Sequence, residues 1–309
     1  MKSEIFLKRF GISLSVIVIV FVAINIYVDV FGLFLGRKDR RVYTNERTSK
    51  YLLSFRYVPE NYNGFILGPS LSANLNPTQI KNYKVYNASI MGANISDLHY
   101  LVKNLLEKGN IKVAIICLDP YLTKEFGKKS ATIDPKEYIG ALGSVNLLKT
   151  YGMLCVRKFN LFPQRFAPDL IDANGWNNFE LEMRDLNSKQ AIDEKVRLKK
   201  HEETKIDPRS YEELAQVIRE LRAKNIQVVA YFSPVPYSIY SIGKEKYGQF
   251  ELAMGKLFIE KDILINLNEE RYQSITSDYT TFIDHGHLSA TGQAFVLREI
   301  QSRLFTQGN

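Results

Sequence analysis

The chain has 309 residues, of which 45% are hydrophobic and 24% charged, a composition typical of a globular protein that excludes long disordered tracts. This length accommodates a membrane anchor plus one domain of roughly 250 residues. The net charge is +8, with basic clusters at 37–41 and 195–205. No nucleic-acid recognition motif accompanies them, and the first cluster follows an apolar segment. Phospholipid headgroups are therefore the expected partner, with anionic polysaccharide as the alternative and nucleic acid excluded.

The N-terminus predicts a membrane span. Residues 10–28 carry no charge and are mostly Val, Ile, Leu and Phe. A helix of this length would be about 28 Å long, close to the hydrocarbon thickness of a bilayer. A cleaved signal peptide is disfavoured because the run is long and no Ala-x-Ala-like site follows it; a buried core helix is the other alternative. We expect an anchor at 1–36 and a juxtamembrane connector at 37–61. Basic residues flank the span on both sides, so charge alone does not set its orientation.

The remaining chain, 62–309, alternates short apolar runs with amphipathic stretches. Apolar runs without alternation are typical of strands covered on both faces, and they lie at 64–67, 84–86, 112–117, 227–232 and 263–267. One amphipathic helix is expected between Ser96, as N-cap, and Gly109; a second follows Asp207-Pro208, and the last begins near Ser289. The pattern predicts an α/β fold, a doubly wound three-layer sandwich with a mainly parallel sheet of about five strands and one preceding transmembrane helix.

An insertion at about 121–206 is too long for a simple crossover between the third and fourth strands. Loops after the carboxyl ends of strands carry specificity in such sheets, so it is a candidate acceptor-binding cap; a surface subdomain is the equal alternative. It contains Trp176, the only tryptophan. The indole could stack on a sugar ring, but we favour a role in anchoring the insertion.

Two cysteines do not make a disulfide framework. Cys117 ends an apolar run and is expected to be a buried small hydrophobe. A single Cys117–Cys155 bridge in an oxidising compartment is the alternative.

Two motifs at opposite ends of the domain carry chemistry. Gly68-Pro69-Ser70 follows the first apolar run, which puts Ser70 at the carboxyl end of a strand. In Asp284-His285-Gly286-His287 a carboxylate precedes an imidazole by three residues. A serine hydroxyl needs a base to become a good nucleophile, and a histidine base works best when a carboxylate fixes its tautomer. The sequence thus contains all three groups of a serine triad.

Each of these residues has a competitor. Ser72 lies two residues beyond Ser70 and is expected to be a solvated hydroxyl in the following helix. His285 competes with His287 as the base. The two histidines could also bind a metal, but the sequence offers no convincing further ligands, so we expect none.

Gly-x-Ser after the first strand and Asp-x-x-His before the last helix resemble the first and last sequence blocks of the SGNH (GDSL-type) hydrolase superfamily. The resemblance implies that Ser70 is the nucleophile, His287 the base and Asp284 its orienting partner. The stretch 86–94 is similar to the second block, which implies an oxyanion hole formed by the backbone of Ser70 and Gly92.

The third block differs from the family pattern. The family usually carries Gly-x-Asn-Asp there, whereas this chain has Cys117-Leu118-Asp119-Pro120. Loss of one oxyanion donor costs roughly a hundred- to a thousand-fold in rate, so catalysis needs a replacement. Asp119 and Trp176 are the candidate substrate-binding residues.

The anchor, 118–120 and 233–236 look like the membrane-anchored branch related to alginate O-acetylation and teichoic-acid D-alanyl transfer proteins. That resemblance implies an acyltransferase that moves an acyl group, acetyl by preference, to a cell-surface polysaccharide. It further implies one pass through the bacterial cytoplasmic membrane, an extracytoplasmic catalytic domain, no cofactor, and a polytopic partner of the membrane-bound O-acyltransferase type. The alternatives are a membrane-tethered carbohydrate esterase or lipase, and a glycan-binding or scaffolding subunit, which the missing asparagine favours.

Overall fold

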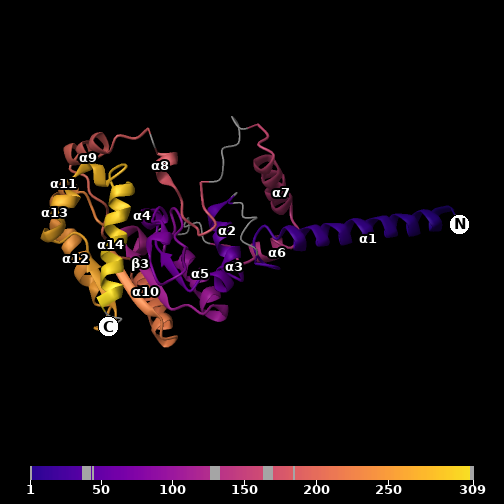
Figure 1. Ribbon diagram of the computed structural model, residues 1–309, viewed down its shortest axis with the longest axis horizontal. Helices are drawn as coiled ribbons and strands as arrows, with labels where there is room; N and C mark the ends of the chain where they lie inside the picture. Colours follow the sequence, from indigo (N-terminus) through magenta and orange to yellow (C-terminus); the bar gives the residue numbers. More distant parts are fainter. Residues whose placement is uncertain are drawn as a thin grey trace.

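The computed structural model describes residues 2–36, 43, 45–125, 133–162, 170–183 and 185–306, so the basic cluster at 37–41 lies outside the described residues. The first helix, α1 (Lys2–Val28), projects from the domain as a long rod (Figure 1). Its apolar side chains are exposed nearly all round, which contradicts the core-helix alternative. Within the described residues α1 is the one helix long and apolar enough to cross a membrane, as an anchor or a signal sequence.

The domain is built on a parallel sheet of five strands. Their order is β2-β1-β3-β4-β5. Every neighbouring pair is parallel. The strands are β1 (Gly64–Leu67), β2 (Val85–Asn87), β3 (Val113–Leu118), β4 (Gln227–Phe232) and β5 (Ile263–Asn266). The predicted α/β fold and its five strands are confirmed, with strand ends shifted by no more than one residue. Order reverses at β1, and ligands bind at such reversal points in open α/β sheets.

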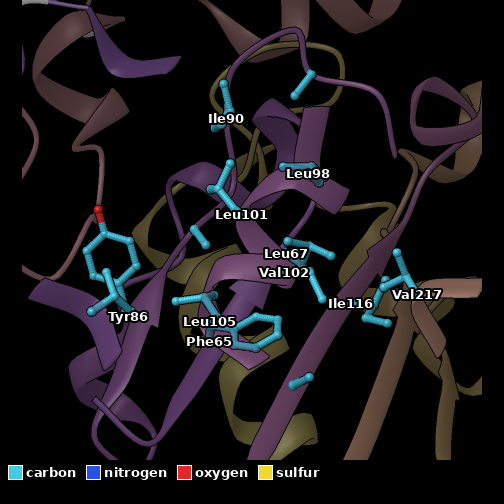
Figure 2. Close-up of a cluster of buried hydrophobic side chains, with 14 of the residues drawn as sticks. Phe65, Leu67, Tyr86, Ile90, Leu98, Leu101, Val102, Leu105, Ile116 and Val217 are labelled. Atoms are coloured by element: carbon cyan, nitrogen blue, oxygen red, sulfur yellow. The ribbon is translucent and has the colours of Figure 1, made fainter. Parts of the chain in front are cut away.

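Helices cover both faces of the sheet. Because strand side chains alternate, Phe65 and Leu67 face one layer, formed by α2 (Glu46–Leu53), α5 (Ile95–Lys108) and α10 (Pro208–Ala223). Figure 2 shows the leucines of α5 lying over Phe65. Ile66 faces the opposite layer, where α14 (Ala290–Thr306) packs. These two apolar layers confirm the three-layer sandwich.

The N-cap of α5 differs from the prediction. Asn94, not Ser96, caps the helix, because its side chain accepts from the backbone N–H of Asp97. The hydroxyl of Ser96 instead donates to Glu213 on α10. The sequence offers two possible caps, Asn94 and Ser96, at this helix end. Asn94 caps the helix because the Ser96 hydroxyl is bonded to Glu213 instead.

The insertion after β3 has two parts, one beside α1 and one packed on α11. Residues 133–162 carry α6 (Glu137–Gly140) and α7 (Val145–Lys158), which lie beside the end of α1 (Figure 1). Residues 170–183 and 185–206 carry α8 (Phe179–Glu182) and α9 (Ser188–Arg197), and α9 packs on α11. The remaining helices are α3 (Tyr57–Asn61), α4 (Ser70–Ala73), α11 (Tyr237–Ile242), α12 (Lys244–Gly255) and α13 (Gln273–Thr276), with 3-10 turns at Pro77–Gln79, Pro120–Thr123, Glu270–Tyr272 and Tyr279–Thr281.

Candidate active site

Ser70 is placed by a tight strand-to-helix turn. β1 ends at Leu67, and Ser70 is already the first residue of α4. The turn needs glycine at position 68, because a side chain there would meet Cys117 on β3, with a Cβ–Cβ distance of 2.7 Å. Ser70 therefore lies at the carboxyl edge of the sheet, between β2 and β3, as the motif predicts.

A compact loop before α14 presents the second motif. The N–H of Ile283 donates to the carbonyl of His287 at 2.8 Å, which closes the loop. Inside it, one carboxylate oxygen of Asp284 accepts from the N–H groups of Gly286 (2.8 Å) and His287 (2.7 Å). This turn holds the Asp284 carboxylate against the His287 ring.

The structure brings Ser70, His287 and Asp284 together in one hydrogen-bonded chain. Nε2 of His287 lies 3.0 Å from Oγ of Ser70, and Nδ1 lies 2.8 Å from Oδ2 of Asp284. With the ring proton on Nδ1 donated to the carboxylate, Nε2 is free to accept from the serine hydroxyl. This geometry is that of a serine, its base and the group that orients the base.

The Asp284 carboxyl is ionised in this arrangement. Burial by itself would raise its pKa, but the hydrogen bond and charge of His287, together with the two backbone N–H groups, lower the pKa to about 2. The carboxylate thus stays negative at any working pH. A carboxylate at Nδ1 favours the tautomer that carries its proton there and would stabilise a protonated ring.

Neither competitor occupies a triad position. Ser72 is fully buried, with its oxygen 2.8 Å from the Ser89 hydroxyl and 3.1 Å from the Pro69 carbonyl, so the prediction of a solvated hydroxyl was wrong. Residues two apart in a helix point to different sides, so Ser72 faces Ser89 while Ser70 faces His287. His285 points into the same cavity as the triad, and burial lowers its pKa. Among the described residues no group of three His, Cys, Asp or Glu side chains is arranged to hold a metal.

Ser70 and His287 open into a cavity at the carboxyl edge of the sheet. Its walls come from the loops after β1, β3 and β4, from the insertion and from the loop before α14. The lining residues are Pro69, Ser70, Leu71, Asp119, Tyr121, Lys195, His201, Glu202, Pro234, Val235, Pro236, Ile239, Tyr247, His285, Gly286 and His287. The cavity therefore has an apolar wall from the β4 loop and a charged wall from the insertion.

Of the two candidate substrate-binding residues, Asp119 lines the cavity and Trp176 does not. Asp119 directly follows β3, lines the cavity and accepts from the N–H of Tyr121 at 2.8 Å. Burial raises its pKa to about 7, although the Tyr121 N–H opposes the rise. Trp176 does not line the cavity. Its indole N–H donates to the carbonyl of Asn74 at 2.8 Å, a contact that ties the insertion to the end of α4.

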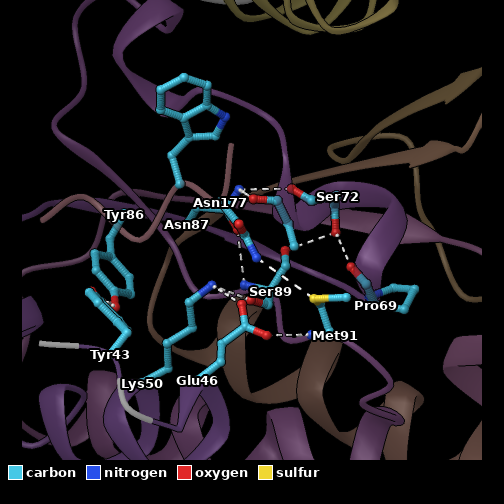
Figure 3. Close-up of polar contacts among 12 residues, drawn as sticks. Tyr43, Glu46, Lys50, Pro69, Ser72, Tyr86, Asn87, Ser89, Met91 and Asn177 are labelled. Carbon is cyan, nitrogen blue, oxygen red and sulfur yellow. Dashed lines mark hydrogen bonds and ion pairs between the residues drawn. The ribbon is translucent and has the colours of Figure 1, made fainter. Parts of the chain in front are cut away.

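Gly92 lies in a loop that helix α2 holds. Glu46 accepts from the N–H of Met91 at 2.9 Å, and Lys50 donates to the carbonyl of Ser89 at 2.5 Å (Figure 3). Arg47 donates to the carbonyl of Gly92 at 3.2 Å. Gly92 has a positive φ of 65° and lies beside Tyr121, but it does not line the cavity. Its oxyanion role stays a prediction.

Sequence reasoning missed several residues near the triad. The ring of Phe179 packs edge-on to His287 with centroids 5.3 Å apart, and Lys195 and Glu202 reach the cavity from the insertion. The rule that strand-end loops form the site could have indicated Pro234–Pro236 as a wall. No sequence signal marks Phe179 or the α2 residues, because their roles arise from contacts between distant segments.

Both cysteines are free thiols, so the bridge considered from the sequence is wrong. Cys117 is fully buried on β3, and burial raises the pKa of its thiol to about 12. Cys155 is exposed on α7. The two lie on different parts of the fold, which prevents pairing.

No protein-family model and no curated protein sequence matches the chain. Among solved structures, it is similar to one described as "a putative platelet activating factor from Streptococcus pneumonia", with 11% identity, a TM-score of 0.46, and coverage of 84% of this chain and 91% of that one. The function is therefore inferred from the geometry of the site itself.

Proposed function

We propose that the chain is a membrane-anchored, SGNH-like enzyme that transfers an acyl group through a Ser-His-Asp triad. The observation that carries the proposal is the chain of hydrogen bonds from Ser70 through His287 to Asp284, which opens into a cavity at the carboxyl edge of the sheet. One oxygen of Asp284 caps its own turn through the N–H groups of Gly286 and His287, and the other oxygen faces Nδ1 of His287. This is the arrangement that activates a serine.

In the first half-reaction Nε2 of His287 takes the Ser70 proton while Oγ attacks the carbonyl carbon of an acyl donor. The tetrahedral intermediate collapses as the imidazolium returns the proton to the leaving group, which leaves an acyl ester on Ser70. In the second half-reaction His287 removes a proton from the incoming hydroxyl, which attacks this ester and regenerates the serine. Atoms and protons balance over the cycle without a cofactor.

The acceptor separates the two candidate enzymes. We favour a sugar hydroxyl of a cell-surface polysaccharide, with acetyl as the acyl group, on the resemblance to the membrane-anchored branch and on the apolar helix α1. One membrane pass cannot carry an acyl group across a bilayer. A donor made in the cytoplasm therefore requires a polytopic partner, of the membrane-bound O-acyltransferase type. A membrane-tethered esterase is the second candidate, because Ser70 and His287 are only partly buried and water can reach them.

A fluorophosphonate probe tests the nucleophile directly, since it bonds covalently to an activated serine. The full-length protein in detergent should be labelled, and Ser70→Ala should not. Ser241→Ala is the matched control, because Ser241 is an exposed serine on α11 and its removal should leave labelling unchanged. If wild type is not labelled, or Ser70→Ala is labelled equally, both enzyme candidates fail and a binding or scaffolding subunit remains.

A small-ester assay then separates the enzymes. Rapid turnover of p-nitrophenyl acetate by water alone favours the esterase. Slow turnover, together with glycan acylation that needs a membrane partner, favours the transferase. A reporter fused after the C-terminus tests the proposed topology, because activity restricted to the cytoplasm would contradict an extracytoplasmic domain.

A further inference from the structure

α7 presents an apolar stripe that the protein leaves uncovered. One side of the helix is buried: Leu147 and Thr150 face the domain. The opposite side exposes residues at intervals of three and four, the spacing of one helix face. Two of its side chains, Val145 and Leu148, are 67% and 55% exposed. The stripe consists of Val145, Leu148, Gly152, Cys155 and Phe159, and it is extended at its ends by Ile139, Leu142, Leu161 and Phe162.

α7 and the residues that flank it are charged with one sign only, whereas α6 contains Glu137. Between residues 143 and 162 the sequence contains Lys149, Arg157 and Lys158 and no acidic residue. A helix that is apolar on two sides belongs in a core or a membrane, yet this one lies on the outside of the domain. A continuous exposed apolar patch of this kind marks an interaction surface. The basic residues favour an anionic partner.

The position of α7 indicates which partner. Asn25 of α1 donates to the carbonyls of Ala141 (3.3 Å) and Leu142 (3.2 Å), just before α7. The ring of Phe21 packs on Tyr151 of α7, with centroids 6.5 Å apart. Both α1 residues lie in the last eight residues of the uncharged run 10–28. In Figure 1, α7 runs steeply across the direction of α1 at this level.

We propose that α6 and α7 form a platform that lies on the surface of a lipid bilayer. The apolar stripe would enter the boundary between headgroups and acyl chains, as amphipathic interfacial helices do, and the exposed Lys149 and Lys158 would pair with anionic phospholipid. The inference rests on the proposed insertion of α1. When α1 spans the bilayer, its contacts with α7 place α7 at the depth of the headgroups. The two attachments together fix how the catalytic domain sits above the membrane.

A natural cysteine on this surface provides a site for attaching a probe. Cys155 is exposed on the stripe, whereas Cys117 is fully buried, so an environment-sensitive fluorophore can be attached to Cys155 of the full-length protein. In vesicles of phosphatidylcholine and phosphatidylglycerol, its emission should shift to the blue. Lipids spin-labelled near the headgroup should quench most of the fluorescence, and aqueous iodide should quench little. Lys224→Cys, in a Cys155→Ser background, is the control at an exposed residue beyond the end of α10; it should respond only to iodide.

A probe at Val16→Cys, also with Cys155→Ser, reports separately on α1; it is read with lipids spin-labelled deep in the acyl chain, because residue 16 lies inside the uncharged run 10–28. If lipids quench Val16 but iodide quenches Cys155, α1 spans the membrane and the platform is wrong. If lipids do not quench Val16, the anchor fails and the platform fails with it. Iodide-protected Cys155 that crosslinks between copies, without lipid quenching, identifies a second copy as the occupant and overturns the proposal.

Charge substitution on the stripe gives the second measurement. Leu148→Glu and Phe159→Glu together should remove most lipid quenching at Cys155, because a charge cannot enter the acyl boundary. Both side chains are exposed, so the thermal unfolding midpoint in detergent should not change. Unchanged lipid quenching in this variant contradicts the proposed contact.

Discussion

The ammonium of Lys50 lies 2.5 Å from the carbonyl oxygen of Ser89, and both residues are fully buried. The contact joins α2 to the loop that leads to Gly92. Burial lowers the pKa of Lys50, while Glu46, 3.0 Å away, counteracts the fall. A buried charge with a carboxylate and a carbonyl as partners is held firmly in place, because removing either partner leaves the other unpaired.

Lys50→Met should therefore destabilise the protein and misplace the loop. Breaking a buried ion pair costs about 3–5 kcal/mol, a loss to be measured as the free energy of unfolding in urea. Residual folded enzyme should show a lower kcat with little change in KM, because the loop at 89–92 positions groups without touching the cavity. Lys50→Met with Glu46→Gln should recover part of the stability, since no charge is then left alone. An unchanged kcat in a folded variant would rule out the positioning role.

Ser70 and His287 should behave as one unit. Ser70→Ala and His287→Ala should each reduce ester turnover to near background, and the double variant should be no slower than either, because neither group works without the other. The measurement is kcat/KM on p-nitrophenyl acetate for the four members of the cycle. Losses that add in the double variant would mean that the two residues act independently.

Asp284→Asn should lower kcat by up to about 10⁴-fold, because the amide disturbs the histidine tautomer. The effect on stability has a defined pH dependence. The pKa of Asp284 is lowered from 3.8 to about 2, so its stabilising contribution, about 2 kcal/mol, is present above pH 4 and disappears as pH falls through 2. The difference in unfolding free energy between wild type and Asp284→Asn should shrink over that window. A difference independent of pH would contradict the assignment.

Asp119→Asn should change the pH profile. Burial raises the pKa of Asp119 to about 7, so the carboxyl is mostly neutral at pH 6 and mostly ionised at pH 8. An ionised carboxylate in the cavity opposes the negative charge that develops on the acyl oxygen, whereas an amide does not. The ratio of kcat/KM for Asp119→Asn to that of wild type should thus rise by about tenfold as pH rises through 7. A constant ratio would show that Asp119 does not face the reacting carbonyl.

Trp176→Phe distinguishes anchoring from sugar binding. The change removes the indole N–H that donates to Asn74 but keeps an aromatic face. Loss of this hydrogen bond should cost about 1 kcal/mol in the free energy of unfolding and leave KM for the glycan acceptor unchanged. An increase in KM with unchanged stability would instead support a substrate role.

The sequence by itself determined the five strands and the edge of the sheet at which Ser70 and His287 lie. Apolar runs such as 64–67 and 227–232 are local signals, and burial on both faces requires them to be continuous. Gly68 and the three-residue spacing from Asp284 to His287 are local too, because a tight turn and an Asp-x-x-His loop form within a few residues. For that reason the parallel five-stranded sheet and the meeting of Ser70 with His287 could be anticipated.

Tertiary structure decided everything that depends on segments far apart in the chain. Ser72 looks like an exposed helix hydroxyl until Ser89 covers it, and α5 takes Asn94 as its cap because Ser96 pairs with Glu213. Packing likewise recruits Lys50 to the Ser89 loop and Phe179 to His287. Such contacts form only when packing of the layers brings the two surfaces together. No local pattern encodes them, because each residue's partner lies on another element.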